Sequence, residues 1–175
     1  MDEKIAIVHH YLVSLRGGEK VLKALYEVYP NATLFTLFAN TKTTSRFGRK
    51  PNTSWLQGLF RFMPSHKILL PFFPLAAENL DLQDFDIVIT SDASFVKGII
   101  TRPDSLHICY CHSPPRYVWD MEQEYLNSSP LVVHPILRVL SHYLRLADFA
   151  AAQRVDFFVA NSNYTAARIR KFYRR

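Results

Sequence analysis

The chain has 175 residues, 49% of them apolar, which is enough for one domain with a hydrophobic core and argues against a disordered protein. Its 21 Lys and Arg residues exceed its 15 Asp and Glu residues by a formal net charge of +6, which favours anionic partners. The longest apolar run, 68–77, is about half as long as the roughly 20 residues of a membrane-spanning helix, and no signal peptide opens the chain. We therefore expect one domain, 1–175, without a membrane span.

Short apolar runs alternate with helical patterns along the chain. A strand is expected at 4–8, followed by Arg16-Gly17-Gly18 and by apolar residues at helical spacing up to Pro30. The same pattern predicts further strands at 32–38, 86–90, 106–111 and 156–160. Strands that alternate with helices indicate an α/β fold with a parallel sheet and crossover helices.

Three segments outside the expected strands are apolar enough to pack or dock. Segment 54–75 is aromatic and basic, which fits either a helical pair packed on the sheet or a face that binds an anionic membrane surface. Segment 131–155 predicts a long helix, with Pro135 tolerated only near its start. A final helix, 164–173, is expected after a cap at Ser162 or Asn163, with a strongly basic end.

The two cysteines lie two positions apart on one expected strand. Cys109 and Cys111 therefore point to the same face and cannot easily form a disulfide, which favours a reducing, cytosolic compartment. Together with His107 and His112 they supply metal-ligand residue types, but one continuous strand cannot direct four ligands into a tetrahedron. We expect packing for the cysteines and no metal site.

His112 stands where a strand-like run ends in His-Ser-Pro-Pro. In open α/β sheets, ligands bind at the carboxyl ends of the strands, so this position favours a functional imidazole. A hydrogen-bonded structural histidine is the alternative.

Gly17 and Gly18 precede a helix, where backbone N–H groups can bind a phosphate or a sugar hydroxyl. They lack the spacing of a dinucleotide-binding or P-loop motif, and a turn that requires positive φ would use the same residues. Glu19 is either a ligand contact or an acid that complements the helix dipole.

Polar residues also follow two other expected strands. Asp92 lies after the strand at 86–90 and fits either a binding site or a helix cap. Lys97 could neutralise a phosphate or simply be an exposed lysine. Asn161 follows the last strand, where capping is again the alternative.

Several function classes lack their signatures in this sequence. Neither a G-x-S-x-G elbow, an H-E-x-x-H motif nor a kinase signature is present. The basic residues are scattered and no groove-reading or RNA-binding motif is found, so we expect no nucleic-acid partner.

Together, five sequence blocks resemble a known family. They are Lys4-Ile5-Ala6-Ile7-Val8, Gly17-Gly18-Glu19-Lys20-Val21, Ser94 to Gly98, Tyr110 to Asp120, and Arg154-Val155-Asp156 with Val159-Ala160-Asn161-Ser162. The chain resembles, over nearly its whole length, the N-terminal, acceptor-side domain of retaining GT-B glycosyltransferases of family 4, especially mannosyltransferase-like members of polysaccharide and O-antigen assembly. The block from Cys111 to Asp120 is the most specific of these matches.

The resemblance implies a Rossmann-like domain that forms one half of a GT-B fold. It implies transfer of a hexose, with mannose as a candidate, from a nucleotide-diphosphate sugar to a glycan or lipid-linked acceptor with retention. No metal and no cofactor are implied beyond the sugar nucleotide. The compartment would be cytoplasmic, with peripheral binding to the inner face of the membrane as a further option.

The resemblance also assigns roles to individual residues. Gly17 and Gly18 would approach the donor diphosphate and sugar, and His112 would contact the donor sugar as the catalytic residue. The candidates for acceptor or cleft contacts are Arg116, Tyr117, Asp120 and Asp92. Arg154 would organise the domain.

Two departures from the family pattern limit what this chain could do. Related sequences often have a histidine where this chain has Ala93. The C-terminal donor-binding domain has no counterpart here, so we expect little transfer by this chain alone. The alternative is a non-catalytic domain that binds glycan, a membrane surface or a separate C-terminal partner.

Overall fold

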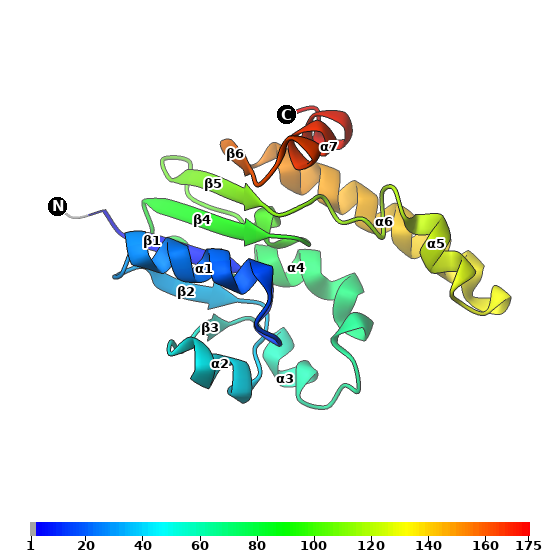
Figure 1. The fold of residues 1–175 in the computed structure, drawn as a ribbon, viewed down its shortest axis with the longest axis horizontal. Helices are drawn as coiled ribbons and strands as arrows, with labels where there is room; N and C mark the ends of the chain where they lie inside the picture. Colours follow the sequence, from blue (N-terminus) through cyan, green and yellow to red (C-terminus); the bar gives the residue numbers. More distant parts are fainter. Residues whose placement is uncertain (1–2) are drawn as a thin grey trace.

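The computed structural model describes residues 3–175 and contains a six-stranded sheet in which every strand pairing is parallel. The strand order is β3-β2-β1-β4-β5-β6 (Figure 1). The strands are β1 (Ile5–His9), β2 (Thr33–Thr36), β3 (Asn52–Thr53), β4 (Ile87–Asp92), β5 (Leu106–Cys111) and β6 (Phe157–Ala160). The protein therefore has the α/β, Rossmann-like fold that the sequence predicts.

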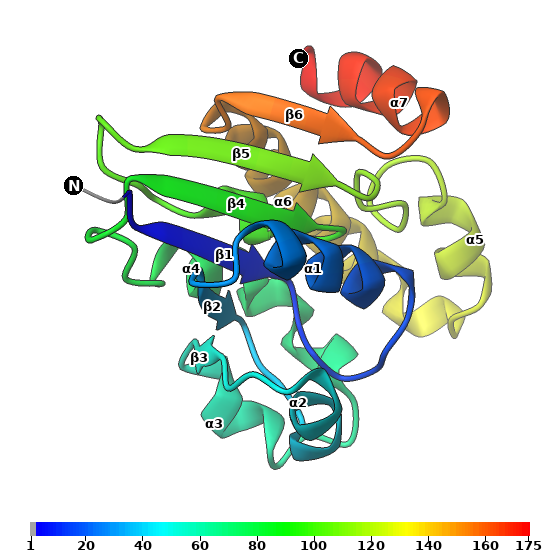
Figure 2. The ribbon, with the colours of Figure 1, turned by 60° about the vertical axis from the view of Figure 1, so that its left-hand side comes forward.

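Helices connect successive strands on the two faces of the sheet. They are α1 (Gly17–Val28), α2 (Thr41–Phe47), α3 (Leu56–Phe60), α4 (Phe73–Glu78), α5 (Glu122–Asn127), α6 (His134–Gln153) and α7 (Asn163–Tyr173). Short 3₁₀ helices occupy η1 (His66–Phe72), η2 (Val96–Gly98) and η3 (Leu131–Val133). Figures 1 and 2 show α1 on one face of the sheet and α4 and α6 on the other.

Alternating residues of strand β1 pack into the hydrophobic clusters on the two faces of the sheet. Ala6 and Val8 pack with residues of α4 and α6, whereas Ile7 packs with residues of α1. Because both faces are covered, the strand reads in sequence as a continuous apolar run, as parallel strands usually do. A third cluster joins β5 to α6 and α7 around Cys109, Cys111 and the fully buried Tyr173. Both cysteines are free and buried, as expected.

All five expected strands are present, but segment 54–75 differs from the expected helical pair. It consists of α3, η1 and the start of α4, because Pro64, Pro71 and Pro74 interrupt any longer helix. Strand β3 was not predicted, since two residues are too few to give a periodic pattern.

The two C-terminal helices agree with the sequence prediction. Helix α6 carries Pro135 in its first turn, and Ser162 caps α7 by accepting a hydrogen bond from the Thr165 N–H at 3.1 Å. Arg154 donates to the Gly98 carbonyl at 2.9 Å and to Glu78 at 2.7 Å, so it connects the end of α6 to η2 and α4. In residues 3–175, no helix is long and apolar enough to cross a membrane.

Candidate functional site

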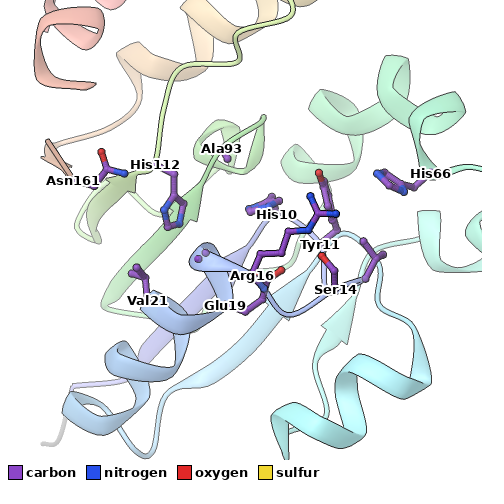
Figure 3. Close-up of a pocket in the computed structure, with 13 residues that line it drawn as sticks. His10, Tyr11, Ser14, Arg16, Glu19, Val21, His66, Ala93, His112 and Asn161 are labelled. Atoms are coloured by element: carbon purple, nitrogen blue, oxygen red, sulfur yellow. The ribbon is translucent and has the colours of Figure 1, made fainter. Parts of the chain in front are cut away.

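A pocket of about 650 Å³ opens at the carboxyl ends of β1, β4 and β5, against the first turn of α1 (Figure 3). Its walls include Gly17, Gly18 and His112, three of the residues that the sequence singles out. Asn161, from the end of β6, also lines it. The parallel sheet brings these positions together because each of them follows a strand at the same edge.

Gly18 lies directly against His9, His10 and His112, of which His10 and His112 line the pocket. A Cβ atom at this position would lie 3.4 Å from His9 Cε1 and 3.7 Å from His112 Nε2, whereas one at Gly17 would meet no atom within 4 Å. Neither residue has positive φ; among the glycines of residues 3–175, only Gly48 does. The turn explanation is therefore wrong, and a Cβ atom at Gly18 would make ordinary van der Waals contact with the imidazoles.

Three histidines converge beneath Gly18. His112 Nε2 lies 2.8 Å from Ser91 Oγ, and His9 Nδ1 lies 3.1 Å from the same oxygen. His10 Nδ1 lies 3.3 Å from the Ser91 carbonyl oxygen. A single residue at the end of β4 thus fixes imidazoles from the ends of β1 and β5.

The imidazoles in this pocket favour the neutral form. Burial, reinforced by neighbouring His9, lowers the pKa of His10 to about 3. Burial and His9 also lower the pKa of His112. The pocket therefore offers uncharged ring nitrogens, which suit hydroxyl groups as ligands.

Glu19 closes one side of the pocket as an ionised carboxylate. Its burial opposes ionisation, but the His9 side chain and the backbone N–H groups of Arg16 and Glu19 lower the pKa of Glu19 to about 2. Its Oε2 accepts a hydrogen bond from the Arg16 N–H at 2.7 Å. Glu19 thus complements the start of α1 and also lines the pocket.

The other four candidate residues lie outside this pocket. Arg116 is exposed, and Asp120 pairs with Arg168 at 2.6 Å. Tyr117 is placed 3.1 Å from Ser94 Oγ, and its burial raises the pKa of the phenol well above its usual range. Asp92 is buried and accepts hydrogen bonds from the N–H groups of Ser94 at 2.8 Å and Val96 at 3.2 Å, so it stabilises the turn that leads into η2.

Lys97 is the clearest correction to the sequence interpretation, which treats it as an exposed lysine. Its side chain is 0% exposed, and Nζ donates to Asp92 at 3.0 Å, to the Ser94 carbonyl at 2.9 Å and to Asp148. Asp148 also accepts from Trp119 and Tyr173. Lys97 is therefore the centre of a buried charge cluster and cannot neutralise a ligand in the pocket.

Sequence reasoning missed His9, His10 and His66. His9 ends β1 and His10 follows it, much as His112 follows β5, so the same strand-end signal could have identified them. His66 reaches the pocket from η1, and its ring centroid lies 5.0 Å from that of Tyr11. Nothing in the local sequence around His66 predicts this placement.

The comparisons with known proteins add no relative. No family model, no curated protein and no solved structure matches the chain. Among residues 3–175, no group of three or more His, Cys, Asp or Glu side chains is arranged to hold a metal ion. The class that fold and site define is a Rossmann-like α/β protein with an imidazole-lined pocket at the carboxyl edge of its sheet.

Proposed function

We propose that the chain is the N-terminal half of a retaining, family-4-type GT-B glycosyltransferase. The parent enzyme would transfer a hexose, with mannose as the leading candidate, from a nucleotide-diphosphate sugar to a glycan or lipid-linked acceptor. The observation that carries this proposal is the meeting of His112 and Gly18 in one pocket at the carboxyl edge of a parallel sheet.

The chemistry of the pocket supports a sugar on this side of the cleft. Neutral imidazoles and the N–H groups at the start of α1 can bind hydroxyl groups. The Glu19 carboxylate lies in the same wall and would repel a diphosphate, so we assign the diphosphate mainly to the C-terminal domain of the parent enzyme. His112 would orient the donor sugar during transfer, and the groups of this chain would act by positioning it.

A titration with nucleotide-diphosphate hexoses tests this proposal through Gly18. We expect Gly18→Val to weaken hexose binding at least about tenfold, because the added methyl groups occupy the space beside His112. Gly17→Val is the matched control, since no atom lies within 4 Å of its Cβ position. The measurement is the perturbation of backbone and imidazole NMR signals by GDP-mannose and UDP-glucose.

Two outcomes would contradict the sugar site. One is equal binding by the two valine variants, and the other is the absence of any pocket perturbation by either nucleotide sugar at millimolar concentration. Activity itself requires the domain that completes the cleft. The catalytic proposal therefore fails if the gene encodes no further domain after Arg175 and no neighbouring gene supplies one.

A second candidate function, which can accompany the first, is binding to an anionic membrane surface. Segment 54–75 buries Leu56, Leu69 and Phe73 but leaves six other apolar side chains between 40% and 83% exposed. These six are Trp55, Leu59, Phe62, Ile68, Phe72 and Leu75. Arg61 and Lys67 lie in the same segment and would meet anionic head groups.

Phe62 is the most exposed of these side chains and offers a direct test. We expect the protein to sediment with phosphatidylserine-containing vesicles at low salt and Phe62→Glu to reduce the bound fraction severalfold, because the new carboxylate enters an anionic interface. Val28→Glu, at an exposed apolar position on α1, is the control. No sedimentation at low salt, or equal loss in the two variants, would contradict membrane binding.

A further inference from the structure

A line of polar side chains runs beneath the pocket from α1 to His112. Glu19 Oε1 lies 3.8 Å from His9 Nε2, His9 Nδ1 lies 3.1 Å from Ser91 Oγ, and Ser91 Oγ lies 2.8 Å from His112 Nε2. His9 and Ser91 are completely buried, and Glu19 is 7% exposed. Because these side chains are shielded from water, each buried donor in this hydrogen-bond chain has to find its acceptor within the same hydrogen-bond chain.

The direction of the chain is set at its Glu19 end. The ionised carboxylate can only accept hydrogen bonds. His9 Nε2 is buried without a hydrogen-bond partner, and Glu19 is the carboxylate that it faces. A lone pair on this nitrogen would face a negative charge, whereas an N–H is attracted to it, so the His9 proton belongs on Nε2.

The remaining protons follow from this first placement. With His9 neutral, the proton on Nε2 leaves a lone pair on Nδ1, and this lone pair accepts the hydrogen bond from the Ser91 hydroxyl. The Ser91 oxygen then accepts from the Nε2–H of His112. This leaves the lone pair of His112 on Nδ1.

His10 acquires the same character by a separate route. The Ser91 carbonyl can only accept, so the His10 proton belongs on Nδ1 and the lone pair on Nε2. Within residues 3–175, neither His10 Nε2 nor His112 Nδ1 has a hydrogen-bond partner, and neither is a buried unpaired atom. Both rings line the pocket, with their centroids 6.4 Å apart.

We propose that Glu19, a neutral His9 and Ser91 are positioning residues that hold His112 as its Nε2–H tautomer. The pocket then presents two imidazole lone pairs, His112 Nδ1 and His10 Nε2, to a ligand that donates two hydroxyl hydrogens. This inference rests on the proposed sugar site and specifies which hydroxyl chemistry the site selects. A ligand that lacks one of the two hydroxyls would leave a nitrogen unpaired and bind at least about tenfold more weakly.

The tautomer can be read directly from the histidine ring nitrogens. We expect two-bond ¹H–¹⁵N correlation spectra of the uniformly labelled 175-residue chain, without ligand, to show His112 with an unprotonated Nδ1 and a protonated Nε2. A protonated Nδ1 on His112 would overturn the proposal. In that tautomer His112 Nε2 accepts a hydrogen bond from Ser91, so the donors and acceptors of the hydrogen-bond chain are reversed.

Substitutions at two points of the hydrogen-bond chain test whether these hydrogen bonds determine the His112 tautomer. Ser91→Ala should convert the His112 signals to the averaged pattern of a mixed tautomer, and Ser91→Thr, which keeps the hydroxyl, should restore them. Ser94→Ala is the matched control, because it removes a buried hydroxyl from the same turn but outside the chain. An unchanged His112 tautomer in folded Ser91→Ala would overturn the proposal.

Glu19→Gln tests the other end and remains informative if Ser91→Ala does not fold. The neutral amide can present either its oxygen or its NH₂ group to His9, so the His112 signals should move toward the averaged pattern. Glu27→Gln, an exposed change of the same kind on α1, should leave them unchanged. Equal spectra for the two glutamine variants would overturn the proposal.

Binding of deoxyhexoses separates this inference from the proposed function. GDP-mannose analogues that each lack one hydroxyl should show two positions whose loss weakens binding at least tenfold in the wild type. Tight binding by every analogue would overturn the selection of two hydroxyls. Failure of GDP-mannose and UDP-glucose to bind, together with the expected His112 tautomer, would contradict the sugar site while leaving the hydrogen-bond chain supported.

Discussion

Lys97→Met is expected to lower the free energy of unfolding by about 3–5 kcal/mol. Methionine keeps most of the side-chain volume but leaves the buried carboxylates of Asp92 and Asp148 without their shared cation. The Lys97 pKa is raised well above its usual range: burial opposes the charged form, but Asp148 and Asp92 outweigh it. Lys97 therefore supplies positive charge to the core across the physiological pH range.

Urea unfolding followed by circular dichroism measures this loss. Lys23→Met, an exposed change on α1, is the control and should change stability by less than about 0.5 kcal/mol. In Lys97→Met, the Asp92 and Asp148 carboxyls would be buried without a cation, and this would raise their folded-state pKa values above their unfolded values. Its stability should therefore be greater at low pH and decrease as the pH rises through these values. A loss below about 1 kcal/mol would contradict the central role of Lys97.

A triple variant separates charge from packing. Lys97→Met combined with Asp92→Asn and Asp148→Asn removes the cation and both carboxylates while preserving similar volumes. We expect it to recover part of the stability that Lys97→Met loses, because no uncompensated buried charge remains. Recovery would be incomplete, since Trp119 and Tyr173 would donate to an amide oxygen instead of a carboxylate.

Under the proposed function, His112→Ala is expected to lower kcat of the proposed parent glycosyltransferase at least about a hundredfold, because the group proposed to orient the donor sugar is lost. His112 is only partly buried and contributes one side-chain hydrogen bond, to Ser91. Its removal should therefore lower the free energy of unfolding by only about 1 kcal/mol. The result would be a folded protein with little activity.

Steady-state kinetics of the proposed two-domain parent enzyme, with the nucleotide sugar varied, test this prediction. His142→Ala, at an exposed histidine of α6, provides the control and should retain full activity. Near-normal kcat for His112→Ala would remove His112 from the mechanism. A large loss of stability with proportionate loss of activity would instead assign it a structural role.

The sheet is predictable because each strand has its own local signal. The five expected strands are apolar runs, and burial of such runs in a parallel sheet favours only a few arrangements. Segment 54–75 is less predictable, because its prolines permit several helix breaks and its apolar content fits packing and docking equally well. The strand β3 depends on pairing with β2 and has no local signal of its own.

Some residues of the candidate site can likewise be predicted from the sequence, and others cannot. The strand-end rule identifies His112 correctly as a pocket residue and, applied at the end of β1, would also have identified His10, which lines the pocket, and the buried His9. It misplaces Asp92, which ends β4 but is buried, where it accepts a hydrogen bond from the Val96 N–H and pairs with Lys97. A strand end predicts proximity to the edge of the sheet, but it does not predict in which direction a side chain points.

The sequence by itself determined the parallel α/β fold, the two unpaired cysteines and the edge of the sheet at which Gly18 and His112 meet. These features depend on hydrophobic periodicity and on residues close to one another along the chain. Only the tertiary structure decided that Lys97 is buried against Asp148, 51 positions away, and that Ser91 joins His9 to His112. Such contacts depend on how α6 and three separate strands pack, and because a buried polar group gains its partner only through that packing, no local pattern encodes the pair.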